Sequence, residues 1–399
     1  MQTAVAFVGS HSDYNFFSRF YSGLYTKEFM LTLLTCKPSL WIYARMQNIP
    51  CTFIKNSNNV HINQNVHATT EVCSKEVNER EATRFYNGVF ECLEKLNGIN
   101  NISFVLIWNG HSIPTKAMAA YAQGKKIPTL FFELSNIPQK IFVDPVGVNA
   151  KSLLFQKPEI LSQFAVDEEQ YLAWREKYLE YKRAESATPL AMKSQKVSNV
   201  LMPIDAVAAR FFDIPVIGNM NILKKLNEFS KRNGIKFQYD AYAYTSGQYN
   251  FFPMQLSNDS QLVFNSGISS QEAITVAYEQ SRKQGRDLLI KPHPLERNKV
   301  VFEFLSSIRS KENVYIVNNP TTQIVEYSQE IITINSTVGL EGLIAEKKVT
   351  FLGNSFYRQF NSERLRNYVL GYLIDIDYFS NTPLSDKNIE ELLSRVSIR

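Results

Sequence analysis

The sequence predicts an α/β protein with two Rossmann-like domains that face each other across a cleft, followed by a helical C-terminal tail. Short runs of apolar and β-branched residues alternate with segments of helical periodicity in both halves of the chain, which is typical of parallel sheets with crossover helices. The length of 399 residues exceeds that of a usual single domain. We therefore expect an N-terminal α/β domain with a helical linker at 1–190, a C-terminal α/β domain at 191–360 and the tail at 361–399.

The first domain shows four strand-like runs with helical patterns between them. The strands are expected at Val5–Val8, Cys51–Ile54, Phe104–Trp108 and Thr129–Phe132, and the helices at Lys75–Leu96 and Thr115–Gln123. A further amphipathic helix is expected from Glu168 to Arg183, because its aromatic residues recur at helical spacing.

The second domain repeats this alternation. Its strands are expected at Asn199–Met202, Asn250–Met254, Asp287–Lys291, Val314–Val317, Glu330–Ile334 and Val349–Leu352. Ser270 is expected to cap a helix that runs to Lys283, and Thr321 or Thr322 to begin a short one. The tail from Ser362 has a helical pattern.

Composition indicates a soluble cytoplasmic protein that is at most peripheral on a membrane. The net charge is +5 and no run of five Lys or Arg occurs, so nucleic acid is not an expected partner. All four cysteines lie in the first 92 residues without a Cys-x-x-Cys motif, which favours reduced thiols. The first residues lack the basic segment of a signal peptide, and the apolar stretch Phe29–Tyr43 is interrupted by Lys37-Pro38 and too short to cross a bilayer.

Two strand ends in the second domain offer groups that bind anions. The run Ile332–Ile334 leads through Asn335 into Ser336-Thr337 at the start of a helix, where free N–H groups and the helix dipole favour an anion. The sequence Lys291-Pro292-His293-Pro294 follows another strand, and ligands of open α/β sheets bind at the carboxyl ends of strands. A phosphate fits this set. The alternative is an ordinary helix cap and a surface turn.

A third strand end carries an acid. The strand Asn250–Met254 leads into Gln255-x-x-x-Asp259-Ser260-Gln261, and an Asp beside a cationic phosphate site could act as nucleophile or base. Alternatively, Asn258-Asp259 closes a loop as an Asx turn.

These motifs, in this order, resemble those of bacterial transferases that add Kdo to capsule lipid linkers and O-antigen chains. The resemblance covers residues 250–360 and includes Gly353-Asn354-x-x-Tyr357, with a weaker echo from Phe131-Phe132-Glu133 to Gly147-Val148-Asn149. In that echo, Leu134-Ser135 replaces the acidic-Gly pair of the family. The resemblance implies a GT-B-like fold and a retaining transferase that uses CMP-β-Kdo.

The resemblance also assigns roles to single residues. Asp259 matches the proposed nucleophile, His293 the histidine that contacts the CMP phosphate, and Ser336 and Thr337 the hydroxyl pair at the donor phosphate. Around them we assign the rest of the donor site, which consists of Gln255, Ser260, Lys291, Pro294, Asn335, Gly339 and Glu341.

The other domain offers residues for the opposite side of the cleft. Glu133 follows a strand and is a candidate catalytic base, although a solvated residue or helix cap is the commoner role of such a Glu. Asn109-Gly110 follows another strand and could contact acceptor or donor. No metal or other cofactor is expected, because CMP leaves as a monophosphate; Asp375-x-Asp377 is interpreted as a surface pair.

The sequence thus predicts an enzyme that moves Kdo from CMP-β-Kdo to a glycan or glycolipid acceptor in surface polysaccharide synthesis. Peripheral association with the inner membrane or with a polysaccharide assembly complex is also expected. Two alternatives stay open: a CMP-sialic-acid transferase, because sialic acid shares the anomeric carboxylate of Kdo, and a non-catalytic sugar-binding subunit of a capsule assembly complex.

Overall fold

The chain forms two compact α/β units. The computed structural model describes residues 1–59, 66–184, 202–215, 237–244, 247–257, 262 and 266–396. Unit 1 comprises Met1–Leu153, Lys193–Arg232 and Leu373–Arg399, and unit 2 comprises Leu154–Met192 and Asn233–Tyr372. The units therefore differ from the three consecutive segments expected from sequence, because the chain returns to unit 1 twice.

Unit 1 is built on a six-stranded sheet in the order β3-β2-β1-β4-β5-β6. The first five strands are parallel and β6 is antiparallel to β5. The strands are β1 (Gln2–Phe7), β2 (Phe29–Thr35), β3 (Cys51–Phe53), β4 (Ile102–Trp108), β5 (Thr129–Leu134) and β6 (Ile141–Asp144). The order reverses between β1 and β4, which is where ligands bind in doubly wound sheets.

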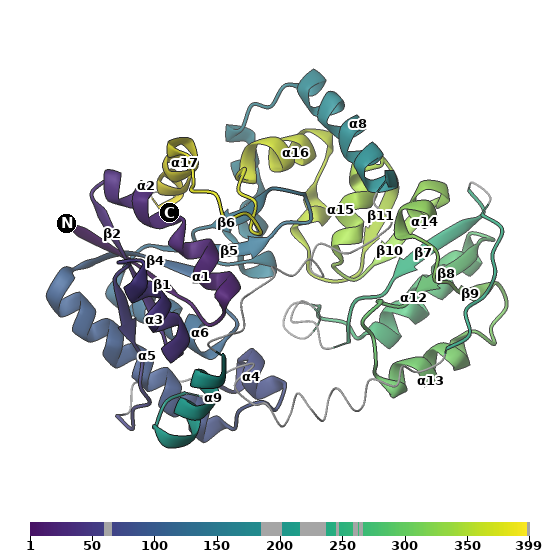
Figure 1. The fold of residues 1–399 in the computed structure, drawn as a ribbon. Coiled ribbons are helices and arrows are strands. Elements are labelled where there is room, and N and C mark those ends of the chain that lie inside the picture. The colour runs from purple at the N-terminus through teal and green to yellow at the C-terminus, as the bar shows by residue number, and fades with distance from the viewer. Residues whose placement is uncertain are drawn as a thin grey trace. The chain divides into compact units, whose positions relative to one another are not determined.

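Helices connect the strands of unit 1 and cover its sheet (Figure 1). They are α1 (His11–Ser18), α2 (Phe20–Thr26), α3 (Pro38–Met46), α4 (Thr70–Cys73), α5 (Glu79–Asn100), α6 (Ile113–Lys125), α9 (Met202–Phe211) and α17 (Asp386–Val396). The Asn78 side chain caps α5 by accepting from the N–H of Glu81, so this helix begins four residues later than predicted.

The tail is helical only in part. Helix α16 (Ser362–Asn367) and a π-helical turn (Tyr368–Tyr372) belong to unit 2. The chain then leaves helical structure: Ile374 forms an isolated bridge with Ile141, and Ile376 is buried in the core of unit 1. Helix α17 adds Ile389 and Leu392 to the same core.

Unit 2 contains a five-stranded parallel sheet in the order β11-β10-β7-β8-β9. Its strands are β7 (Tyr249–Pro253), β8 (Asp287–Lys291), β9 (Val314–Ile316), β10 (Glu330–Thr333) and β11 (Lys348–Phe351). Each lies within one residue of its predicted bounds. The strand predicted at Asn199–Met202 lies outside the described residues except for Met202, which begins α9.

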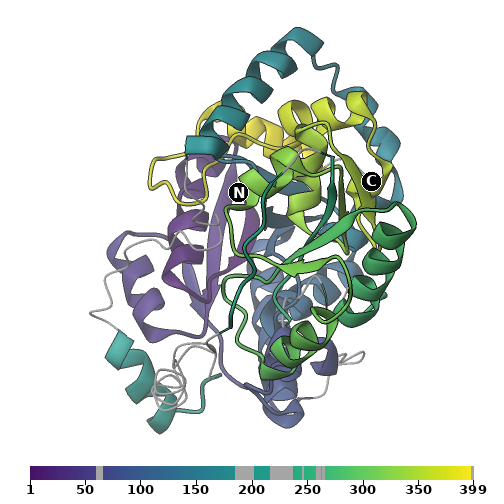
Figure 2. The same cartoon turned by 90° about the vertical axis from the view of Figure 1, so that its right-hand side faces the viewer.

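Both faces of this sheet are buried, as expected for a parallel sheet. Side chains of alternate residues point to opposite faces: Leu288 and Ile290 lie in one core cluster and Leu289 in another. Figures 1 and 2 show helices over both faces. These helices are α12 (Ser270–Lys283), α13 (Lys299–Ile308), α14 (Thr321–Tyr327) and α15 (Thr337–Ile344), and α8 (Glu168–Ala184) contacts α14.

One predicted cap is wrong by a residue. Ser269, and not Ser270, is the N-cap of α12. Its hydroxyl accepts from the N–H of Glu272 while the Glu272 carboxylate accepts from the Ser269 N–H, which forms a capping box.

Short 3-10 turns occur at Val66–Ala68, Asn149–Lys151, Pro158–Gln163 and Phe356–Gln359, and α7 (Leu153–Gln156) is a single turn. No helix within the described residues is long and apolar enough to span a membrane.

Candidate functional site

The carboxyl edge of the unit 2 sheet brings three polar segments together. Strand β7 lies between β10 and β8, and all three run parallel, so their carboxyl ends share one edge. Pro253 pairs with Lys291 at this edge, and Thr333 ends the neighbouring strand. The predicted motifs after these three strands are therefore neighbours in the structure.

Gln255 and Asn335 join the segments that follow β7 and β10. The Gln255 Nε2 donates to Asn335 Oδ1 at 2.8 Å, and its Oε1 accepts from the Asn335 backbone N at 3.3 Å. This two-way amide pairing fixes the loop from which α15 begins. Because both residues lie at the sheet edge, their mutual bonds shape the site whether or not they also contact a ligand.

Ser336 is the N-cap of α15. Its hydroxyl accepts from the N–H of Val338 at 3.2 Å, and the residue is buried. Thr337 is the first residue of the helix and is exposed. Ser336 thus has a structural role at the start of the helix, while Thr337 presents its backbone N–H and hydroxyl where the helix dipole favours an anion.

Lys291 is buried at the end of β8. Its ammonium donates to the carbonyl of Asn319 at 2.7 Å and to the Thr321 hydroxyl at 2.9 Å. Burial lowers the pKa of Lys291 to about 8, against the opposing charge of Glu341. The residue therefore brings a positive charge close to the edge and also links β8 to the start of α14.

His293 lies two residues further on and is half-buried. Its Nδ1 accepts from the Leu295 backbone N at 3.1 Å. In the neutral ring the proton then resides on Nε2, which is the nitrogen that could donate to a phosphate oxygen. The next residue, Pro294, is exposed and shapes the turn after the histidine.

Glu296 belongs to this edge, although no sequence pattern singled it out. The residue is 2% exposed, and its carboxylate accepts from the backbone N–H groups of Ser257, Arg297 and Asn298 and from the Ser257 hydroxyl. Burial acts to raise the pKa of Glu296, but these hydrogen bonds lower it below its ordinary value. Glu296 thereby anchors Ser257, which directly precedes the Asn258-Asp259 segment.

Gly339 and Glu341, which we predicted to bind the donor, have structural roles in unit 2: Gly339 packs against the sheet and Glu341 forms an ion pair. A Cβ on Gly339 would collide with the ring of Phe351, so glycine allows α15 to lie close to the sheet. Glu341, one turn into α15, accepts from Lys182 of α8 at 3.0 Å, and its side chain is 12% exposed. Their proposed contacts with a donor stay predictions.

Asp259 and Ser260, the predicted nucleophile and its neighbour, lie outside the described residues. Their assignment therefore continues to depend on the sequence motif. The structure describes the chain up to Ser257, and the Glu296 carboxylate fixes that last position.

Unit 1 brings together its own pair of predicted residues at the carboxyl ends of β4 and β5. Asn109 Nδ2 donates to Glu133 Oε2 at 2.9 Å, and the Asn109 backbone N donates to the carbonyl of Phe132 at 2.8 Å. Asn109 and Gly110 have φ values of +60° and +81°, a left-handed turn that Asn and Gly tolerate. Glu133 is thus oriented by Asn109.

His111 and Glu71 lie near this turn and were not selected as site residues. Burial, together with Lys151 and Lys116, lowers the pKa of His111 to about 4, so the ring is neutral at pH 7. The Glu71 carboxylate accepts from the N–H of Ile113 at 3.0 Å, and burial raises the pKa of Glu71 to about 7. The sequence Asn109-Gly110-His111 after a strand was the available signal for the histidine; Glu71 had none.

The Asp-x-Asp sequence lies in unit 1. Asp375 pairs with Lys140, and the Asp377 backbone carbonyl accepts from Arg19 at 2.7 Å. In the part of the chain that the structure describes, no group of three His, Cys, Asp or Glu residues could hold a metal ion.

Comparison with known proteins identifies the family. Residues 104–360, more than half of the chain, match the model of the capsule polysaccharide biosynthesis protein family, and the chain belongs to this family. It is 32% identical to the capsule polysaccharide export protein KpsS of Escherichia coli over 114 residues, which are 26% of this chain and 29% of that protein. It is 26% identical to the capsule polysaccharide modification protein LipB of Neisseria meningitidis over 152 residues, 35% of each.

The matched segments thus span about a third of the length of these two relatives. Among solved structures, a KpsC β-Kdo 2,4 transferase from Thermosulfurimonas dismutans is 17% identical with a TM-score of 0.44, covering 73% of this chain and 88% of that one.

Proposed function

We propose that the protein is a glycosyltransferase that moves Kdo from CMP-β-Kdo to a glycan or glycolipid acceptor with retention of configuration. Membership of the capsule polysaccharide biosynthesis family and the ordered motifs support this proposal. The single observation that carries it is the common carboxyl edge of β10, β7 and β8, because His293, Gln255 and the N-terminus of α15 all follow these three neighbouring strands. An anionic leaving group fits this edge.

The donor phosphate would lie between the His293 loop and the start of α15. The Nε2–H of His293 and the backbone N–H of Thr337 could each donate to a phosphate oxygen, and the charge of Lys291 adds attraction without direct contact. CMP leaves as a phosphate monoester, and these groups would stabilise the negative charge that develops on it. In transferases that use nucleotide diphosphates, a metal ion has this role. This is the basis for expecting no metal requirement.

Retention follows from two displacements in the proposed mechanism. The Asp259 carboxylate attacks the anomeric carbon of Kdo, the bond from that carbon to the CMP phosphate oxygen breaks, and CMP departs with the electron pair. The acceptor hydroxyl then attacks the same carbon, displaces Asp259 and gives its proton to a base. Glu133 is the candidate base, and Asn109 Nδ2 orients its carboxylate at 2.9 Å.

Release of CMP tests the donor assignment. The chain is incubated separately with CMP-Kdo and CMP-sialic acid, and CMP is measured in each. Faster release from CMP-Kdo supports the proposal, faster release from CMP-sialic acid selects the sialic-acid transferase, and no turnover with bound CMP supports a sugar-binding subunit. His293→Ala should lower turnover by about 10²-fold if it meets the phosphate charge; unchanged kinetics would remove His293 from the site.

Mass spectrometry tests the nucleophile. With donor and no acceptor, the proposed covalent intermediate makes the intact protein heavier by one Kdo residue, about 220 Da. Asp259→Asn should bind CMP but transfer no Kdo and form no adduct, because an amide of nearly the same shape is a poor nucleophile. Transfer at the wild-type rate by Asp259→Asn would refute the role. A dead variant without any wild-type adduct would make Asp259 a base or an electrostatic stabiliser.

We further propose that the enzyme acts in the cytoplasm, where nucleotide sugars are made, and works with the machinery that assembles surface polysaccharide. Family membership supports the second part. Cell fractionation of a host strain, followed by detection of the chain, tests the compartment.

A further inference from the structure

Lys37 of unit 1 is a buried cation without an acceptor. In the part of the chain that the structure describes, the Lys and Arg residues that are at least nine-tenths buried are Arg19, Lys37, Lys291 and Arg395. The other three donate to backbone carbonyl oxygens at distances from 2.6 to 3.2 Å. The ammonium of Lys37 has neither a hydrogen-bond acceptor nor an ion-pair partner among the described residues, although the residue is only 8% exposed. A buried charge is costly unless it is paired.

His11 lies close to Lys37 and also has an unsatisfied nitrogen. Burial and the nearby charge of Lys37 lower the pKa of His11, against the opposing effect of Asp205, so the ring is neutral at pH 7. Its Nε2 is buried and has no hydrogen-bond partner within the described residues. The ring packs edge-on against Tyr43, with the ring centroids 5.7 Å apart, and this contact fixes its orientation.

The carboxylates near Lys37 accept hydrogen bonds from other groups. Asp13 Oδ2 accepts from the Gly9 backbone N at 3.2 Å. Asp205 Oδ1 accepts from the Ser39 backbone N at 2.8 Å, and Oδ2 accepts from the Ser39 hydroxyl at 2.6 Å. The charges of these two acids act on the same region as that of Lys37, but the three N–H donors of the ammonium still lack the acceptor that buried polar groups ordinarily have.

The two unsatisfied side chains lie at the carboxyl edge of the unit 1 sheet. His11 follows β1 and Lys37 follows β2, and these strands pair in parallel. Ligands of doubly wound sheets bind at this edge, close to the point where the strand order reverses, which here lies between β1 and β4. Helix α1 begins at His11 and α3 begins directly after Lys37, so both helix dipoles add positive potential at this edge.

We propose that Lys37 and His11 bind an oxyanion, a phosphate or carboxylate group, at this edge of unit 1. The ammonium supplies the charge and the Nε2–H of the neutral imidazole supplies a directed hydrogen bond. The site is distinct from the donor phosphate site proposed for unit 2, because strands of a different sheet build it.

The same edge also carries the Asn109–Glu133 pair. Strands β2, β1, β4 and β5 are consecutive neighbours in the sheet, so Lys37, His11, Asn109 and Glu133 follow or end four adjacent strands. Adjacent strands lie about 4.8 Å apart, and a ligand that reaches from Lys37 to Glu133 would therefore span roughly 14 Å. Identifying this ligand with the acceptor rests on the proposed function, whereas the oxyanion site itself does not.

Titration calorimetry with the full-length chain tests the site. The probes are inorganic phosphate, glycerol 1-phosphate and gluconate, with glycerol as the uncharged comparison. The wild type should bind at least one of the three anions but not glycerol, and the anion that binds best distinguishes a phosphate, a phosphate ester and a sugar carboxylate as the source. Lys37→Met should weaken this binding by about tenfold or more, because the charge is lost at nearly constant length.

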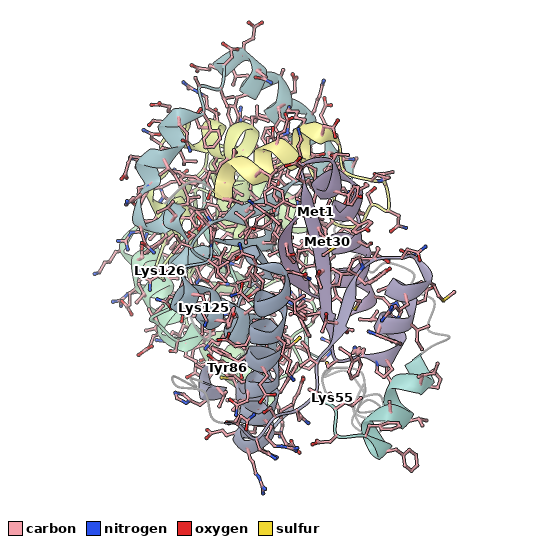
Figure 3. All side chains as sticks on the ribbon, turned by 90° about the vertical axis from the view of Figure 1, so that its left-hand side faces the viewer. Met1, Met30, Lys55, Tyr86, Lys125 and Lys126 are labelled. Carbon is pink, nitrogen blue, oxygen red and sulfur yellow. The ribbon has the colours of Figure 1, made fainter. Side chains whose placement is uncertain are left out.

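Three further variants locate the binding. His11→Phe keeps the ring packed against Tyr43 but removes Nε2, and it should also weaken binding. Lys125→Met is the matched control: Lys125, at the end of α6 (Figure 3), is 45% exposed and pairs with Glu94 at 2.9 Å, so its loss should leave the affinity unchanged. His293→Ala changes the donor edge of unit 2 and should likewise leave it unchanged. Binding that His293→Ala abolishes and Lys37→Met does not would overturn the proposal.

Thermal unfolding without ligand separates a binding role of Lys37 from a structural one. Removal of an unpaired buried charge should raise the Tm of Lys37→Met by about 2 °C or more, whereas removal of a structural contact would lower it. A lower Tm, equal anion binding by wild type and Lys37→Met, or no binding of any of the three anions overturns the proposal. Failure of the proposed function has a different signature, because CMP-Kdo would then release no CMP while the oxyanion still binds.

Discussion

Replacing Glu296 with Gln should loosen the donor edge of unit 2. The Oε1 atom accepts hydrogen bonds from the Ser257 hydroxyl at 3.1 Å and from the Arg297 and Asn298 N–H groups at 2.8 Å each, and Oε2 accepts from the Ser257 N–H at 2.9 Å. The best orientation of the glutamine amide places its oxygen where the Oε1 atom of Glu296 was. Its NH₂ group then faces the N–H of Ser257, so one buried donor loses its acceptor.

The expected loss of stability is about 2–3 kcal/mol. An unsatisfied buried donor costs about 1–3 kcal/mol, and the three remaining hydrogen bonds lose the strength that a charged acceptor gives them. Because Ser257 leads directly to the Asp259 segment, the same change should weaken CMP binding or lower turnover. Urea unfolding followed by circular dichroism measures the first effect, and titration calorimetry with CMP measures the binding.

The pH dependence of the unfolding free energy provides a second check on the role of Glu296. The pKa of Glu296 in the folded protein lies below its ordinary value of 4.5, because its hydrogen bonds outweigh the effect of burial. Its stabilising contribution is therefore fully present above about pH 4.5 and is lost as the pH falls through the folded pKa. The difference in unfolding free energy between wild type and Glu296→Gln should shrink in that acidic range, since a protonated carboxyl resembles an amide.

A matched substitution separates this effect from a general loss of charge. Glu303 lies on the surface of α13, 60% exposed, and pairs with Lys299 at 3.4 Å. Glu303→Gln should change stability by less than about 0.5 kcal/mol, as exposed ion pairs within a helix contribute little. Equal effects of the two substitutions, or an unchanged Glu296→Gln protein, would refute the anchoring role of Glu296.

Three further outcomes are expected. Gly339→Ala should destabilise the protein by about 1–3 kcal/mol, because the added methyl group meets the ring of Phe351. Gly124→Ala, with open space around it, should stabilise the protein by about 0.5–1 kcal/mol through helix propensity. Thermal unfolding of both variants measures these two effects. The pKa of Lys291 is about 8, so the affinity for CMP should fall as the pH rises through 8. The fall should be smaller in Lys291→Arg, because arginine keeps its charge. A CMP affinity that does not change with pH in this range would show that the charge of Lys291 does not contribute to donor binding. Transfer should survive EDTA, and loss of activity that Mg²⁺ or Mn²⁺ restores would contradict a metal-free mechanism.

Much of the fold could be predicted because its signals are local. Apolar runs that end in polar residues predicted β8 with its bounds and every other strand of unit 2 within one residue. Strand β2 (Phe29–Thr35) was missed, because its Leu and Met residues suit a helix as well as a strand and Lys37-Pro38 follows closely. Strand β6 was missed because it is only four residues long and lies antiparallel at the sheet edge.

The site could be predicted only where its residues follow strands directly. The topology of the sheet then collects them without further information, as it does for Gln255, His293 and Asn335. Glu296 depends on a contact with Ser257 across 39 residues, and no spacing in the sequence announces such a pair. Likewise, α9 is joined to the start of α3 by the hydrogen bonds between Asp205 and Ser39, which lie 166 residues apart in the chain.

Gly339 illustrates how a motif residue can serve a ligand site without contacting the ligand. Its lack of a side chain lets α15 approach Phe351 of β11, and Gly342, one turn later, does the same against Ile331 of β10. The position of the helix over the sheet determines where its N-terminal N–H groups point. The hydrogen bonds between Gln255 and Asn335 fix the loop that precedes α15. Together with the packing of Gly339 and Gly342, they direct the start of α15 toward the edge where the donor phosphate is proposed to bind. Gly339→Ala should therefore weaken CMP binding even at temperatures where the protein remains folded.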